Sequence, residues 1–285
     1  MIDGMPVSGL GVHVMVVEEH AADVSEVEQH LAAVEATYAP LIIGDNSRLE
    51  GGVKLWDQFT DAVASYRKGG TTFAAVYERI NELAIARLLL IDQSLAGCRI
   101  LYEPEIAADD SRIDFVVSGV ECGNHYIEVK TVRPTAEDSE QNWRKYEKRR
   151  EHHPASVKYI VARGAMGAAI YNNSFSARSK FMEYVRDFEP KLAAANGVQP
   201  GRGVLVFCGS GMEWHRSELE DFADFYRTRQ HRQDDPFAAM EAEALRSGSK
   251  PLQGNIAAFG FLKRHMDDTI GEKWTPDVRG PACFR

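Results

Sequence analysis

The sequence predicts a mixed α/β protein in which helices flank a central sheet. Three observations predict this class. Hydrophobic residues make up 44% of the 285 residues and charged residues 26%, which is ordinary globular usage. Some segments repeat apolar residues at three- and four-residue steps, whereas others are short and β-branched, so both helices and strands are expected. From residue 69 onward their order is helix, three strands, helix, strand, helix, strand, helix, most simply one sheet between helices.

An acidic N-terminal segment is predicted to form an α/β extension. Residues 1–50 contain nine acidic residues and one base, whereas the other residues contain 33 acids and 32 bases. Lys68-Gly69-Gly70 then interrupts the helical pattern. We therefore expect an extension over residues 1–68 and a second domain over residues 69–285.

The elements before the sheet follow from their apolar spacing. Val12–Val17 is β-branched and is typical of a strand. Ala22–Thr37 and Val53–Tyr66 have the spacing of amphipathic helices. Thr71-Thr72 can cap a longer helix over Phe73–Gln93.

Three strands are predicted next: Arg99–Ile106, Arg112–Ser118 and His125–Val132, with a hairpin turn at Gly119–Gly123 between the last two. After them we expect helices at Glu137–Glu151, Phe175–Ala195, 215–229 and 236–246, and strands at Tyr159–Ala162 and Gly203–Cys208.

Two acids and a lysine on the predicted hairpin carry the functional signal. Asp114 lies between Ile113 and Phe115, and Glu128-Val129-Lys130 lies on the following strand. Alternation places Glu128 and Lys130 on one face of that strand. If the hairpin turns at the two glycines, paired residue numbers add up to about 242, and Asp114 lies opposite Glu128.

Two opposed carboxylates repel each other unless a cation lies between them. Oxygen ligands suit Mg²⁺ or Mn²⁺, so Asp114 and Glu128 are the predicted metal ligands. Lys130 could position a water or stabilise charge on an attacked phosphate. Glu82 lies near the apolar stripe of the preceding helix and is expected to support the site, with Glu78, one turn earlier, as a substitute. These residues indicate hydrolysis of a phosphodiester.

This arrangement resembles the PD-(D/E)XK nuclease superfamily, which has a restriction-endonuclease-like fold. The resemblance covers residues 72–162, with isoleucine in place of proline before Asp114. It implies that Asp114 and Glu128 bind Mg²⁺ or Mn²⁺, that Lys130 is the catalytic lysine and that Glu82 is the helix glutamate. It also implies a metal-dependent nuclease, most simply a DNA endonuclease, with DNA favoured over RNA.

A basic helix after the lysine strand is the predicted nucleic-acid contact. The bases of Gln141–His153 are interleaved with aromatic residues, a pattern that suits a phosphate backbone and stacking on a base. A solvated helix with its aromatics on the sheet is the alternative. The residues proposed to contact nucleic acid are Trp143, Arg144, Lys145, Lys148 and Arg149.

Other interpretations stay open. The hairpin could be an amphipathic surface pair in a module that binds nucleic acid or protein without catalysis. The turn Gly209–Gly211 between a strand and a helix could bind a nucleotide instead. A second acid-x-Lys triplet, Glu189-Pro190-Lys191, lies in a predicted helix, and we take it to be a chance match.

The chain is expected to work in the cytoplasm. No stretch approaches the ~20 apolar residues of a membrane helix. The start of the chain lacks a basic signal-peptide region, and the four cysteines are far apart without metal-site spacing. A homodimer would suit cleavage of both strands of a duplex.

Overall fold

A computed structural model of the protein describes residues 24–44, 48–71, 73–106, 112–119, 123–132, 178–210, 216–228, 236–264 and 273–276. In this part of the chain, seven strands form one sheet in the order β1-β2-β3-β4-β5-β6-β7. Pairing is parallel for β1 with β2, β4 with β5 and β5 with β6, and antiparallel for the other neighbours. The sheet is therefore mixed, as the sequence predicts.

The strands are β1 (Leu49–Glu50), β2 (Arg99–Tyr102), β3 (Phe115–Ser118), β4 (Asn124–Val132), β5 (Gly201–Ser210), β6 (Ile256–Arg264) and β7 (Lys273–Pro276). The helices are α1 (Val24–Ile42), α2 (Gly52–Arg67), α3 (Phe73–Ile91), the 3₁₀ helix η1 (Gln93–Leu95), α7 (Arg178–Val198), α8 (Arg216–Thr228) and α9 (Pro236–Arg246).

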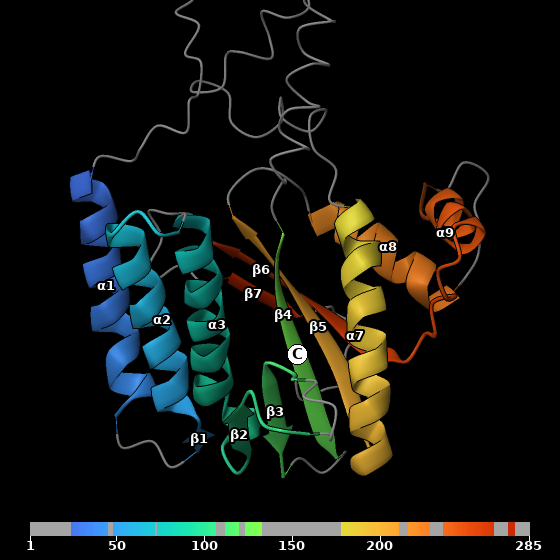
Figure 1. Ribbon diagram of the computed structural model, residues 1–285. Coiled ribbons are helices and arrows are strands. Elements are labelled where there is room, and N and C mark those ends of the chain that lie inside the picture. Colours follow the sequence, from blue (N-terminus) through green and yellow to red (C-terminus); the bar gives the residue numbers. More distant parts are fainter. Residues whose placement is uncertain are drawn as a thin grey trace, which may run out of the picture.

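Helices cover both faces of the sheet (Figure 1). Helices α1, α2 and α3 share one apolar cluster with the first face, and α7, α8 and α9 share another with the opposite face. The division at residue 68 stays a prediction, although α1 and α2 pack in the same cluster as α3. No helix in the described ranges is long and apolar enough to span a membrane.

Alternation along β4 decides which layer each of its side chains meets. Ile127 and Val129 belong to the cluster on the α3 face, and Tyr126 belongs to the cluster on the α7 face. Glu128 is two residues after Tyr126, so its side chain lies on the same face of the strand and points toward α7. This places Glu128 and Lys130 against a helix that is far from them in the sequence.

The β3–β4 hairpin has the predicted register. Phe115 pairs with Ile127 and Val117 with His125, so each pair adds up to 242. Gly119 and Gly123 both have φ of +94°, a left-handed conformation that glycine adopts without strain. The pairing ends at Phe115, so Asp114 lies one residue beyond the last pair.

Several boundaries differ from the prediction by a few residues: for example, β3 begins at Phe115 instead of Arg112, and α1 ends at Ile42 instead of Thr37. Two of the differences have an identifiable reason. Helix α3 ends at Ile91, two residues early, because the Asp92 carboxylate accepts a hydrogen bond from the Ser94 N–H and starts η1. Strand β2 ends at Tyr102, before the predicted Ile106, because Glu103 adopts φ of +42° and turns the chain. The predicted elements Val12–Val17, Glu137–Glu151 and Tyr159–Ala162 lie outside the described residues.

Candidate functional site

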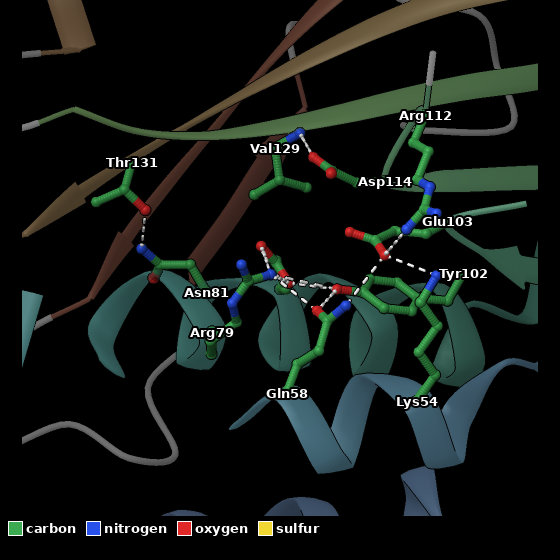
Figure 2. Close-up of polar contacts among 11 residues, drawn as sticks. Lys54, Gln58, Arg79, Asn81, Tyr102, Glu103, Arg112, Asp114, Val129 and Thr131 are labelled. Atoms are coloured by element: carbon green, nitrogen blue, oxygen red, sulfur yellow. Dashed lines mark hydrogen bonds and ion pairs between the residues drawn. The ribbon is translucent and has the colours of Figure 1, made fainter. Parts of the chain in front are cut away.

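Asp114 lies where β3 stops pairing with β4 (Figure 2). The last backbone pair is Phe115 with Ile127. One residue earlier, Asp114 Oδ2 accepts a hydrogen bond from the Val129 N–H at 2.6 Å. The carboxylate thus replaces a backbone acceptor of the sheet, which fixes its position beside β4. The Asp114 carbonyl is held as well, because it accepts a hydrogen bond from the Glu103 N–H at 2.8 Å.

Glu128 is buried, and only one of its two carboxylate oxygens contacts basic side chains. Its residue exposure is 1%. Oε1 lies 2.8 Å from Lys130 Nζ and 2.7 Å from Lys191 Nζ. Oε2 is buried and accepts no hydrogen bond from any residue that the structure describes. A buried carboxylate oxygen without a donor is costly, so this atom is a natural ligand for a cation or a water.

Lys130 lies beside Glu128 on β4 and keeps its charge. Its ammonium lies 5.9 Å from the centre of the Tyr184 ring on α7. Burial works to lower the pKa of Lys130, but the charge of Glu128 and its hydrogen bond outweigh burial and raise that pKa. The ammonium is therefore protonated at neutral pH.

Asp114 is in the opposite situation. Burial raises the pKa of Asp114 well above its usual value, and the charges of Glu128 and Glu82 raise it further. The Val129 N–H and the Lys130 charge only partly offset these effects. In the absence of a cation, the fold thus favours the neutral form of this carboxyl group.

Glu82 lies on α3 and is engaged by neighbours other than Asp114. Both of its oxygens accept hydrogen bonds from Arg79, at 2.9 and 2.8 Å, and Oε2 accepts one from the Tyr102 hydroxyl at 2.7 Å. Gln58 joins Arg79 to Tyr102 in the same network (Figure 2). Burial raises the pKa of Glu82, and Arg79 partly counters this. Glu78 belongs to the same helix but is partly exposed.

Four acids lie close enough to influence one another's pKa, and we call them the carboxylate series: Glu103, Glu82, Asp114 and Glu128. Glu103 raises the pKa of Glu82, and both Glu82 and Glu128 raise the pKa of Asp114. Three of them have a basic partner. Glu103 pairs with Lys54 at 2.8 Å, Glu82 pairs with Arg79, and Glu128 pairs with its two lysines. Among the described residues, Asp114 has no ion pair.

The donor set fits a cation bound by two carboxylates. Glu128 Oε2 accepts no hydrogen bond in the described residues, and Asp114 has no ion pair there, so both carboxylates favour an additional positive charge nearby. No group of three His, Cys, Asp or Glu side chains in the described ranges could hold a metal ion by itself. A divalent ion here would therefore depend on backbone oxygen, water and substrate for its other ligands.

Lys191 is the site residue that sequence reasoning missed. Its triplet with Glu189 is helical and does not match the strand motif, but the position of the lysine on α7 brings it to Glu128. The signal was present in the spacing of α7, since Lys191 lies between the buried Phe188 and Leu192 and so borders the apolar stripe. Glu189 has a separate, structural role, because it accepts hydrogen bonds from the Tyr226 hydroxyl and the Gln253 N–H.

Several predicted site residues cannot be placed. The proposed nucleic-acid contacts all lie outside the described residues: Trp143, Arg144, Lys145, Lys148 and Arg149. Of the glycine turn, Gly209 belongs to the end of β5, and Gly211 lies beyond the part of the chain that the structure describes.

The fold and the site define a mixed α/β protein in which Asp114, Glu128 and Lys130 lie close together beside a hairpin, with Glu128 buried and the other two partly exposed. No protein-family model matches its sequence, and no curated protein is similar to it. Among solved structures, that of Pyrococcus furiosus SfsA in complex with Ca²⁺ is a weak match, with 17% identity and a TM-score of 0.21. The match covers 72% of this chain and 61% of that one, so this chain spans less than two thirds of SfsA. A likeness of this size supports no statement about activity.

Proposed function

We propose that the protein is a metal-dependent nuclease of the PD-(D/E)XK type that hydrolyses phosphodiester bonds, with DNA as its substrate. The observation that carries the proposal is the position of Asp114 in the carboxylate series. It is the member without an ion pair in the described residues, and its pKa is raised by the charge of Glu128, whose Oε2 accepts no hydrogen bond in the same part of the chain. Both features are expected where a divalent cation binds.

Asp114 and Glu128 would hold Mg²⁺ or Mn²⁺. When bound, such an ion lowers the pKa of a coordinated water and polarises a phosphoryl oxygen. Asp114 must be ionised to bind it, and its raised pKa means that the cation has to compete with a proton. We therefore expect binding to strengthen as the pH rises.

Lys130 acts as a charged group in this proposal. Since its pKa is raised, it is not a base at neutral pH. Its ammonium positions the attacking water and stabilises the charge that develops on the phosphate. Glu82 orients the surroundings of the site through Arg79 and Tyr102, and it adds negative charge near Asp114.

The test compares cleavage of supercoiled plasmid, linear duplex and single-stranded DNA by the wild type and Lys130→Ala, with Mg²⁺ or Mn²⁺ and with EDTA. We expect metal-dependent cleavage by the wild type and a loss of at least ~100-fold in the variant, since one preorganised charge is worth about that much. Lys250→Ala, a change at an exposed lysine between α9 and β6, is the matched control. Equal cleavage by all three proteins would rule out Lys130 as a catalytic residue.

A second candidate is a module that binds nucleic acid without cleaving it. The two ammonium groups on Glu128 favour it, because they already satisfy part of its charge. Such a module would bind DNA as tightly in EDTA as in the presence of metal. Neither the wild type nor Lys130→Ala would cleave the DNA. Plasmid cleavage that requires metal and Lys130 would exclude this candidate.

A further inference from the structure

Lys191 brings a second ammonium to the site from a distant helix. It lies on α7, and its Nζ is 2.7 Å from Glu128 Oε1, the same oxygen that Lys130 approaches to 2.8 Å. Two cations therefore share one carboxylate oxygen. The charges of Asp114 and of Asp187, an exposed acid on α7, also act on Lys130, so the two ammonium groups are balanced by several acids rather than by Glu128 alone.

Both ammonium groups are accessible from solvent. The side chains of Lys130 and Lys191 are 26% and 30% exposed, whereas Glu128 is 1% exposed. The carboxylate is thus inside and the two ammonium groups lie at its outer edge. An anion that approaches this edge meets the lysines before it meets the acid, which is the arrangement that phosphate binding requires.

We propose that Lys191 is a phosphate-binding residue, which contacts a backbone phosphate of the nucleic acid while Lys130 serves the phosphate that is cleaved. This inference rests on the proposed function. A cation on Glu128 would satisfy that carboxylate and leave the Lys191 ammonium available to the substrate. A lysine suits this role because it is a compact charge on a flexible stem.

The alternative is that Lys191 only ties α7 to β4. A tether contributes to stability but not to the number of phosphate contacts, so the salt dependence of DNA binding separates the two roles. Each phosphate contact adds about 0.9 to the slope of log K against log salt for duplex DNA. Loss of a single contact lowers affinity for all sequences alike and reduces that slope by about 1.

The experiment measures the fluorescence anisotropy of a short labelled duplex over about 50–200 mM KCl in the presence of Ca²⁺. Ca²⁺ is a hard cation that accepts oxygen ligands, and its looser geometry makes it a poor substitute for Mg²⁺ in the reaction. The duplex is checked on a gel for intactness after each titration. The proteins are the wild type, Lys191→Met, Lys191→Arg and the control Lys250→Met.

We expect Lys191→Met to bind about tenfold more weakly, with a slope smaller by about 1. Lys191→Arg should keep most of the affinity and the full slope, and Lys250→Met should match the wild type. If Lys191→Met keeps the wild-type slope and only its melting temperature falls, Lys191 is a tether and the inference is overturned.

If Lys191 turns out to be only a tether, cleavage of the same duplex in Mg²⁺ shows whether the proposed nuclease function is wrong as well. If the wild type cuts but the slope does not depend on Lys191, the nuclease proposal stands and the inference alone fails. If the wild type binds without cutting, a smaller slope for Lys191→Met still supports the phosphate contact. If the wild type binds no DNA, both are wrong.

Discussion

Asp114 and Glu128 lie close enough for the charge of one to raise the pKa of the other, yet only Glu128 has ion pairs in the described residues. Glu128 is buried with two ammonium groups against it, so its charge is compensated within the described residues. Asp114 accepts a hydrogen bond from the Val129 N–H, and the charges of Glu128 and Glu82 raise its pKa. A carboxyl group with a strongly raised pKa destabilises the fold when it is ionised, and functional sites are where such groups are expected.

Replacement of Asp114 by asparagine is expected to stabilise the metal-free protein. The raised pKa means that folded Asp114 holds its proton more tightly than unfolded Asp114. Ionisation therefore destabilises the fold once the pH rises past the ordinary carboxyl value of about 4, with full effect above the raised pKa. Asparagine keeps an acceptor for the Val129 N–H and has no charge.

In EDTA at pH 7.5, we expect Asp114→Asn to raise the melting temperature by roughly 2–6 °C, equivalent to ~1–2 kcal/mol, and to lose this advantage toward pH 4. Differential scanning calorimetry across pH measures both effects. Asp61→Asn, at an exposed acid on α2, is the control and should show neither. A lower melting temperature for Asp114→Asn at pH 7.5 would mean that the carboxylate has a counter-charge.

At the scale of elements, contact between α7 and β5 depends on the absence of a side chain at Gly203. A Cβ at this position would lie 2.3 Å from Leu192 Cδ2, and Leu192 is fully buried on α7. An alanine would push the helix away from the sheet. Because Lys191 is the neighbour of Leu192, the same displacement would move the second ammonium of the site.

We expect Gly203→Ala to lower the free energy of unfolding by about 1–3 kcal/mol, the usual effect of overpacking a core. Urea denaturation measures it. Gly197→Ala is a matched control on α7 itself, because a Cβ there meets nothing within 4 Å and alanine favours a helix. The two variants should differ in sign, and equal stability for them would contradict tight packing at Gly203.

The sequence predicted those elements whose pattern extends over several residues. The hairpin register followed from two turn glycines and from alternation, and the pairing of Phe115 with Ile127 and of Val117 with His125 confirms it. Strand β1 has two residues and β7 has four, too few for a period to be recognised. The spacing of α7 places Lys191 at the border of its apolar stripe, but which strand residue it meets depends on the long-range pairing of β4 with β5, and no local pattern encodes that pairing.

At the scale of the whole molecule, cation binding is linked to unfolding. A ligand that binds only the folded protein stabilises it, by about 2.7 kcal/mol at a hundred times its Kd. We therefore expect saturating Mn²⁺ to raise the melting temperature of the wild type by roughly 5–10 °C over EDTA. Asp114→Asn should lose most of this shift.

Thermal unfolding of the wild type and Asp114→Asn, each with EDTA and with increasing Mn²⁺, is the measurement. Asp61→Asn again controls for the loss of one negative charge. An identical shift in all three proteins would place the bound ion away from Asp114, and no shift in the wild type would favour the module that binds nucleic acid without metal.

The parallel pairing of β4 with β5 also has a consequence for the order in which the chain folds. The β3–β4 hairpin closes locally, so Asp114, Glu128 and Lys130 meet as soon as it forms. Lys191 reaches them only when β5 pairs with β4, which are separated by residues 133–200 in the sequence. Pairing of strands that are so far apart in the sequence is slow. Since synthesis proceeds from the N-terminus, the part of the chain that contains the two acids and the first lysine is complete before Lys191 is added.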